Sequence, residues 1–160
     1  MNLDTFYSIV AGTCFALLGL WWTVMESRRD LLKDDQVRAL AGGVYLSFLI
    51  PGAMSLGAQI GGENKLVWRS VFVIAALLGM YFTIRLIGST RSLGRPGFFR
   101  RNRWFAILLY LFVLVLGAFP TLAAPTGLTA IQVEGFLLAL LVLLGHGLAW
   151  EFMVETAPRG

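Results

Sequence analysis

Residues 104–123 read WFAILLYLFVLVLGAFPTLA, a run without a single charged side chain. The hydrocarbon core of a bilayer is about 30 Å thick, and about 20 apolar residues in an α-helix cross it. Residues 133–154, which read VEGFLLALLVLLGHGLAWEFMV, form a second run of similar length with only Glu134 and Glu151 charged. These two runs predict membrane-spanning helices.

The composition of the whole chain agrees with a membrane protein. Of its 160 residues, 58% are hydrophobic and only 14% are charged, and the mean hydropathy is +0.76. Soluble domains carry about 25% charged residues, because their surface is in contact with water and has to be largely polar. An ordinary soluble fold is therefore excluded.

Three further apolar runs precede the two quoted above, at residues 5–25, 39–60 and 67–87. The run at 39–60 holds serine, glycine, proline and glutamine, yet it has no charged residue and is long enough to cross a membrane. The sequence thus predicts an all-α integral membrane protein, one domain over residues 1–160. Its five transmembrane helices lie at about 5–25, 39–60, 67–87, 104–123 and 133–154.

Basic residues alternate between the connections of these helices. Lys and Arg in short connections accumulate on the cytoplasmic side of a membrane. The second connection has Lys65 alone, and the fourth has no basic residue; the first has Arg28, Arg29, Lys33 and Arg38. The third has five arginines. We therefore expect the N-terminus outside and the C-terminus in the cytoplasm, in a cell membrane such as the inner membrane of a bacterium.

The third connection, residues 89–103, also fits contact with lipid. Five arginines without an acidic residue next to a span favour anionic headgroups on the cytoplasmic side. Topology already explains basic residues at this place, so nucleic acid is not an expected partner. The arginines expected on headgroups are Arg91, Arg95, Arg100, Arg101 and Arg103.

Small and polar residues recur every four positions in the second run. Membrane helices pack through such residues because they let two backbones approach closely. A shorter stripe of Ser8, Gly12 and Ala16 lies in the first run. The second stripe is either a packing seam or the wall of a polar path, and Pro51 is expected to kink or unwind its helix. Its members are Ala39, Gly43, Ser47, Pro51, Ser55 and Gln59.

Four charged residues lie inside the predicted spans, one turn from either surface. Arg69 matches Glu134 in depth, and Arg85 matches Glu151, which makes these residues candidate ion pairs within the bundle or candidates for a role in transport or gating. We favour the plainer interpretation, in which all four side chains extend to the headgroups with their stems in lipid. The sequence separations differ by one residue, about 100° around a helix, so both pairs at once are disfavoured.

His146, the single histidine, lies between Gly145 and Gly147 in the last run. Its imidazole is a candidate ligand for a haem or a quinone, or a proton relay toward Glu151. The relay is disfavoured because five residues turn a helix by about 140°. The plainer alternative is a hydrogen bond to a neighbouring helix. No cofactor is predicted apart from a haem or quinone at this position.

No phosphate-binding loop, metal-ligand spacing or nucleophile with a base occurs in the sequence. We therefore predict no enzyme activity, no catalytic residue and no metal ligand. The leading hypothesis is a bundle that acts through helix–helix contacts, as a subunit of a larger membrane complex or as a self-assembling oligomer.

Two alternatives come from other classes of function. One is a small channel or transporter, with a path along the helix of Pro51 and past His146. The other is a redox subunit that binds haem or quinone. The candidate ion, proton or ligand residues are His146, Gln59, Ser55, Ser47 and Glu151.

Overall fold

The computed structural model describes residues 2–62, 64–89 and 98–156, and these residues form helices joined by short connections without any strand. The helices are α1 (Leu3–Ser27), η1 (Arg29–Lys33), α2 (Asp35–Gly61), α3 (Lys65–Ser89), α4 (Phe98–Arg101), α5 (Trp104–Ala118), η2 (Pro120–Thr126) and α6 (Ala130–Glu155). The fold is all-α, as predicted from the sequence.

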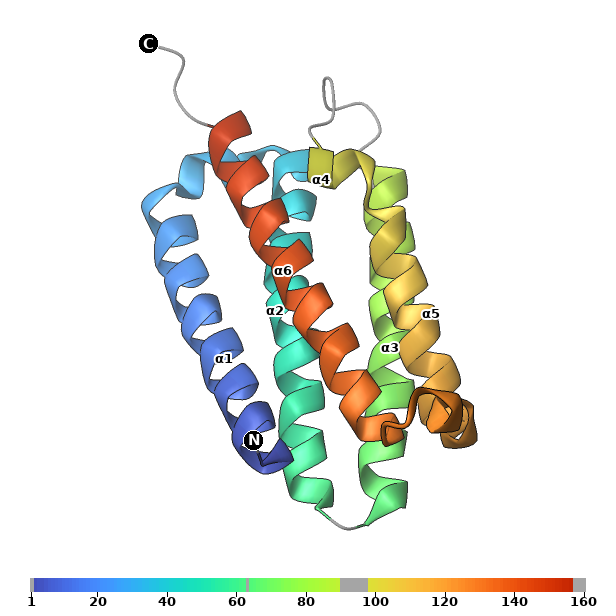
Figure 1. The fold of residues 1–160 in the computed structure, drawn as a ribbon. Helices are drawn as coiled ribbons and strands as arrows, with labels where there is room; N and C mark the ends of the chain where they lie inside the picture. Colours follow the sequence, from blue (N-terminus) through green and yellow to red (C-terminus); the bar gives the residue numbers. More distant parts are fainter. Residues whose placement is uncertain (1, 63, 90–97, 157–160) are drawn as a thin grey trace.

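The long helices lie side by side in one bundle, with α2 near its centre (Figure 1). α1 packs on α2, α2 on α3 and α3 on α5, while α6 packs across α2 and α5 and also contacts α1. One end of the bundle carries η1 and α4, and the opposite end carries η2 and the turn between α2 and α3. We refer to these as the η1/α4 end and the η2 end.

Local signals set the helix ends. The Asp34 side chain accepts hydrogen bonds from the backbone N–H groups of Gln36 and Val37, which satisfies two free donors at the start of α2. Thr129 and Gln132 form a capping box at the start of α6. α2 stops where Gly62 takes a φ of 47°, a conformation that favours glycine. These caps lie outside the apolar runs, so α2 and α6 are longer than their runs.

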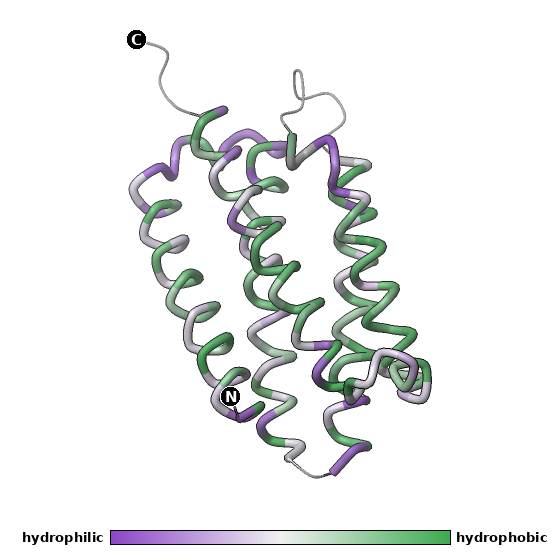
Figure 2. Tube along the Cα trace, viewed as in Figure 1, coloured by the Kyte–Doolittle hydropathy of each residue, from purple (hydrophilic) through white to green (hydrophobic). Residues whose placement is uncertain are grey.

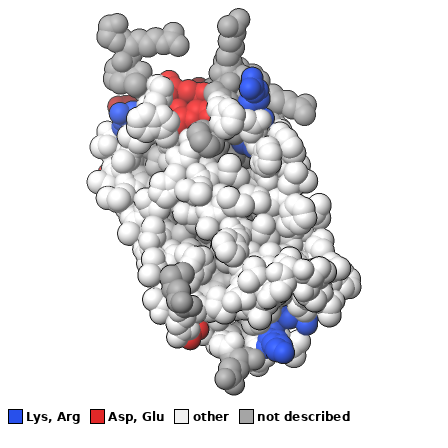
Figure 3. Space-filling view, in the orientation of Figure 1, with Lys and Arg blue, Asp and Glu red and all other residues white. Residues whose placement is uncertain are grey.

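Four helices, α1, α2, α3 and α6, are long and apolar enough to cross a membrane, and α5 with η2 makes a fifth candidate if the bent pair is one span. Hydrophobic residues cover the middle of the bundle, while polar residues gather toward its ends (Figure 2). On the face in Figure 3, the Lys, Arg, Asp and Glu side chains likewise lie near the two ends. This distribution matches a bundle whose middle faces lipid.

The predicted helix at 104–123 is shorter in the structure. α5 ends at Ala118, and η2 continues at an angle of 104° to it. Pro120 has no N–H to donate and disfavours a helical conformation at Phe119, whose φ and ψ are −126° and 73°. The 15 residues of α5 rise only about 22 Å.

α2 continues through Pro51 as one helix and does not unwind there, while the expected kink at Pro51 stays a prediction. The small residues of its predicted stripe contact three different helices in turn. A Cβ atom at Gly43 would overlap Leu86 of α3, and Ser47 lies against Gly145 of α6. Further along, Gln59 is hydrogen-bonded to α1. The stripe therefore winds from one neighbour to the next, which makes α2 the central packing element.

Candidate functional site

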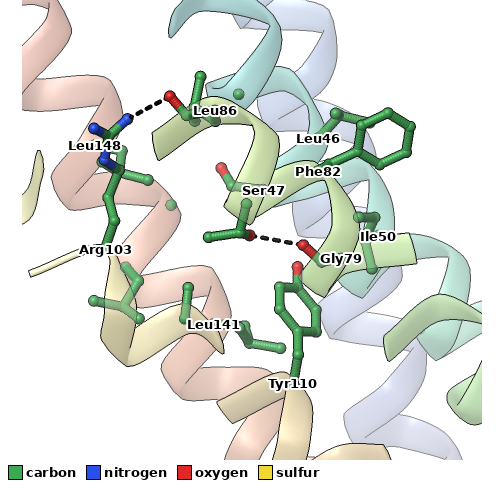
Figure 4. A pocket seen from close by; sticks show the side chains of 15 residues that line it. Leu46, Ser47, Ile50, Gly79, Phe82, Leu86, Arg103, Tyr110, Leu141 and Leu148 are labelled. Carbon is green, nitrogen blue, oxygen red and sulfur yellow. Dashed lines mark hydrogen bonds between the residues drawn. The ribbon is translucent and has the colours of Figure 1, made fainter. Parts of the chain in front are cut away.

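A small cavity lies in the interior of the bundle, between α2, α3, α5 and α6 (Figure 4). Its volume is about 50 Å³, whereas pockets for small organic ligands measure about 300–1,000 Å³. Ser47 and Thr83 line it, but their hydroxyls donate to carbonyls of their own helices at 2.7 Å each. The Tyr110 ring lies against Gly79. This cavity has room for a few water molecules and no more.

Glu134 is the most unusual side chain of the core. It is 0% exposed, and neither of its carboxyl oxygens has a hydrogen-bond partner among the described residues. Tyr7 lies close enough for electrostatic interaction with it, yet the Tyr7 hydroxyl donates to the carbonyl of Ile131 at 2.6 Å. A buried polar group without a partner is costly, and in a membrane it marks a candidate functional site.

Arg69 does not form the candidate ion pair with Glu134. Its Nε donates to the carbonyl of Gly117 at 2.8 Å and its Nη2 donates to that of Ala118 at 2.7 Å. These carbonyls belong to the last turn of α5, where the end of the helix leaves them without helical donors and where the helix dipole is negative. The guanidinium therefore caps α5 from the start of α3.

Arg103 makes the converse contact. Its Nη1 lies 3.4 Å from the carbonyl of Leu86, in the last turn of α3 (Figure 4). α3 and α5 are antiparallel neighbours, so each helix carries near its start an arginine that reaches the end of the other. Sequence reasoning assigned Arg103 to lipid headgroups, but its side chain is only 9% exposed.

The other arginines predicted to contact headgroups are only partly described. Arg91 and Arg95 lie outside the described residues, and for Arg100 only the backbone in α4 is described. Arg101 is exposed at the η1/α4 end. Its contact with lipid stays a prediction.

The second candidate ion pair does not form either. Arg85 is exposed on α3, and no ion pair joins it to Glu151 in the part of the chain that the structure describes. Glu151 is half-buried and lies beside Glu155 at the η1/α4 end. The exposed position of Arg85 fits the other interpretation, in which its side chain extends toward lipid headgroups.

His146 is exposed on α6 and does not line the cavity. Its Nδ1 lies 3.0 Å from the carbonyl of Val142, and its ring packs edge-on against Phe48 at 5.2 Å between ring centres. Gly145, beside it, gives Ser47 and Phe48 of α2 close access to α6. Gly145 therefore serves the packing of α6 on α2. His146 lies on the surface of the bundle, whereas the predicted channel path needs it in the interior.

Ser55 and Gln59 lie toward the η2 end of α2. The Gln59 amide accepts from the hydroxyl of Ser8 at 2.8 Å and donates to the carbonyl of Ser55 at 3.2 Å. The Ser55 hydroxyl is fully buried and has no partner among the described residues. Gln59 therefore joins α1 to α2, which explains its place in an apolar helix.

α1 has two opposite faces with the same spacing. Its buried face, spaced by four and three residues in alternation, consists of Tyr7, Ala11, Cys14, Leu18, Trp21 and Met25. About half a turn away, by 100° per residue, lies a row of exposed small residues. We call this row the α1 outer face; it consists of Gly12, Ala16, Gly19 and Thr23. A Cβ atom at either glycine would meet nothing within 4 Å.

Comparison of this chain with protein-family models, with curated proteins and with solved structures finds no match.

Proposed function

We propose that this protein acts through helix–helix contacts in a membrane, as a subunit of a larger assembly or as an oligomer of itself. It crosses the bilayer five times, α5 with η2 making the fourth crossing, with the N-terminus outside and the C-terminus in the cytoplasm. Supporting this orientation, η1 and α4 carry arginines at the same end of the bundle.

The α1 outer face is the observation that carries the proposal. Lipid chains fill the space beside any side chain, so lipid alone gives a helix no reason to alternate small residues in a four-and-three pattern. A second helix does, because small residues at this spacing let two backbones approach and gain dispersion contacts. α1 uses the same spacing on its buried face, where it packs on α2.

Gly12→Leu tests this contact. The new side chain enters open space in the isolated chain, so the fold is retained, while an approaching helix is blocked. We expect the variant to lower association at least tenfold, equal to about 1.4 kcal/mol. The measurement is the oligomeric state by native mass spectrometry in lipid-like detergent, with co-purification from the native membrane to detect other subunits.

Gly88→Leu is the matched control. Gly88 is also open, but it lies on α3 and away from the α1 outer face. The control is expected to associate like the wild type. A wild-type chain that is monomeric and binds no membrane partner, or a Gly12→Leu variant that associates normally, contradicts the proposal.

A second candidate function, a small proton channel or transporter, rests on Glu134 and not on His146. A carboxyl group held inside a membrane bundle without a partner is suited to take up and release a proton or cation. Proteoliposomes with an imposed pH gradient test it. Proton flux that Glu134→Gln abolishes and His146→Ala leaves intact is the expected result for this function, and a wild type without flux excludes it.

A further inference from the structure

A groove lies between α1, η1 and α2 at the η1/α4 end, separate from the cavity and from the α1 outer face. Its volume is about 320 Å³, within the range of sites that hold small molecules. Its walls are apolar, and three charged side chains lie among them. The lining thus combines the two surfaces that a phospholipid presents, hydrocarbon and headgroup.

Aromatic side chains form the apolar wall. The Trp21 Nε1 donates to the carbonyl of Ala41 at 3.1 Å, so this ring is held against α2. Trp22 and Tyr45 pack edge-on across the groove, with ring centres 6.2 Å apart. Gly42, which lines the same groove, leaves space open beside α2, because a Cβ atom there would meet nothing within 4 Å. Tryptophan and tyrosine favour the headgroup level of a bilayer.

The charged part of the lining carries both signs. Glu26 and Arg29 form an ion pair at 2.7 Å, and Arg38 forms one with Asp35 at 2.6 Å. Glu26, Arg29 and Arg38 all line the groove. Both pairs are exposed, with side-chain accessibilities from 60% to 84%, so water screens them and they contribute little to stability. Their charges remain available to a ligand that carries the complementary pattern.

We propose that this groove is a binding site for phosphatidylethanolamine. One acyl chain lies along Trp22 and Tyr45 over Gly42, the phosphate accepts hydrogen bonds from Arg29 and Arg38, and the ammonium donates to Glu26. A purely anionic headgroup leaves Glu26 facing a phosphate. A choline headgroup has no N–H to donate, so neither alternative matches all three charged residues.

The test uses the delipidated protein in detergent and three lipids with identical acyl chains, whose headgroups are ethanolamine, choline and glycerol. Native mass spectrometry measures how much of each lipid stays bound. We expect the ethanolamine lipid to bind at least tenfold more tightly than the other two. Equal retention of all three lipids, or a preference for the glycerol headgroup, overturns the proposal.

Variants connect this preference to the groove. Glu26→Gln is expected to remove the preference for ethanolamine over choline, whereas Arg38→Gln weakens all three lipids. Gly42→Leu fills the groove and is expected to weaken all three at least tenfold, with Gly88→Leu as the control that leaves lipid binding unchanged, since Gly88 is open and lies on α3, away from the groove. Should Gly42→Leu fail to fold, Trp22→Ala replaces it, since Trp22 is 66% exposed. Wild-type binding by the folded groove variant contradicts the site.

Discussion

Arg69 offers the sharpest test of what stabilises this bundle. Its guanidinium makes two hydrogen bonds to the end of α5, at 2.7 and 2.8 Å. A hydrogen bond to a charged group contributes about 1.5–3 kcal/mol, so two give about 3–6 kcal/mol. Because Arg69 is only half-buried, we expect the lower end, about 3 kcal/mol, for the loss caused by Arg69→Met.

Arg69→Lys separates geometry from charge. An ammonium keeps the charge but lacks the planar fork that reaches both carbonyls, so about half of the stabilisation should be lost. Reversible unfolding by SDS in mixed micelles, followed by circular dichroism, measures both variants. Arg85→Met is the control, since Arg85 is exposed on the same helix and its loss should change stability by less than about 0.5 kcal/mol.

The reasoning is refuted if Arg69→Met costs no more than Arg85→Met, or if lysine at position 69 restores full stability. In the first case the two short contacts carry no net free energy in lipid. In the second, the charge near the end of α5 suffices and the bidentate geometry is irrelevant.

Four further outcomes follow from the described contacts. Arg103→Met should lower stability by less than Arg69→Met, since its bond to the end of α3 is long at 3.4 Å; a larger loss in the same SDS titration contradicts this. Gly79→Ala should cost about 1–3 kcal/mol, because the new methyl group meets the Tyr110 ring, whereas Gly88→Ala enters open space and should be neutral in thermal unfolding. Glu134→Leu should raise the free energy of unfolding by about 1–3 kcal/mol by removing a buried group without a partner; destabilisation would mean that the carboxyl is bonded in the membrane. The purified protein should show no Soret band in its absorbance spectrum, and a band would favour the redox hypothesis for the single histidine.

The sequence predicts where the long helices lie, because an apolar run of about 20 residues in so hydrophobic a chain is best explained as a membrane-spanning helix. It did not predict the end of α5, although Pro120 was a visible signal, because the residues directly after Pro120 are also uncharged and extend the run to the length of a full span. The apolar run therefore predicts one continuous span, although the residue before a proline disfavours the helical conformation.

The side-chain partners were harder to predict. Pairing Arg69 with Glu134 considered only charged side chains, whereas the backbone carbonyls at the end of α5 are acceptors that no pattern of residue types displays. The sequence also did not reveal that His146 faces outward from the bundle. α6 is apolar on all sides, so its periodicity does not reveal which face packs inward, and the close contact of Gly145 with α2 decides it.

The contact between Arg69 and the end of α5 also has a consequence for biogenesis. Arg69 leaves the ribosome 48 residues before Gly117, the first carbonyl that it binds. In the topology proposed above, α3 enters the membrane during that interval with its guanidinium dependent on water or headgroups, because the carbonyls at the end of α5 have not yet been synthesised. In that topology the two helices reach their stable arrangement only as an inserted hairpin, which makes the pair, and not the single helix, the unit of integration into the bilayer.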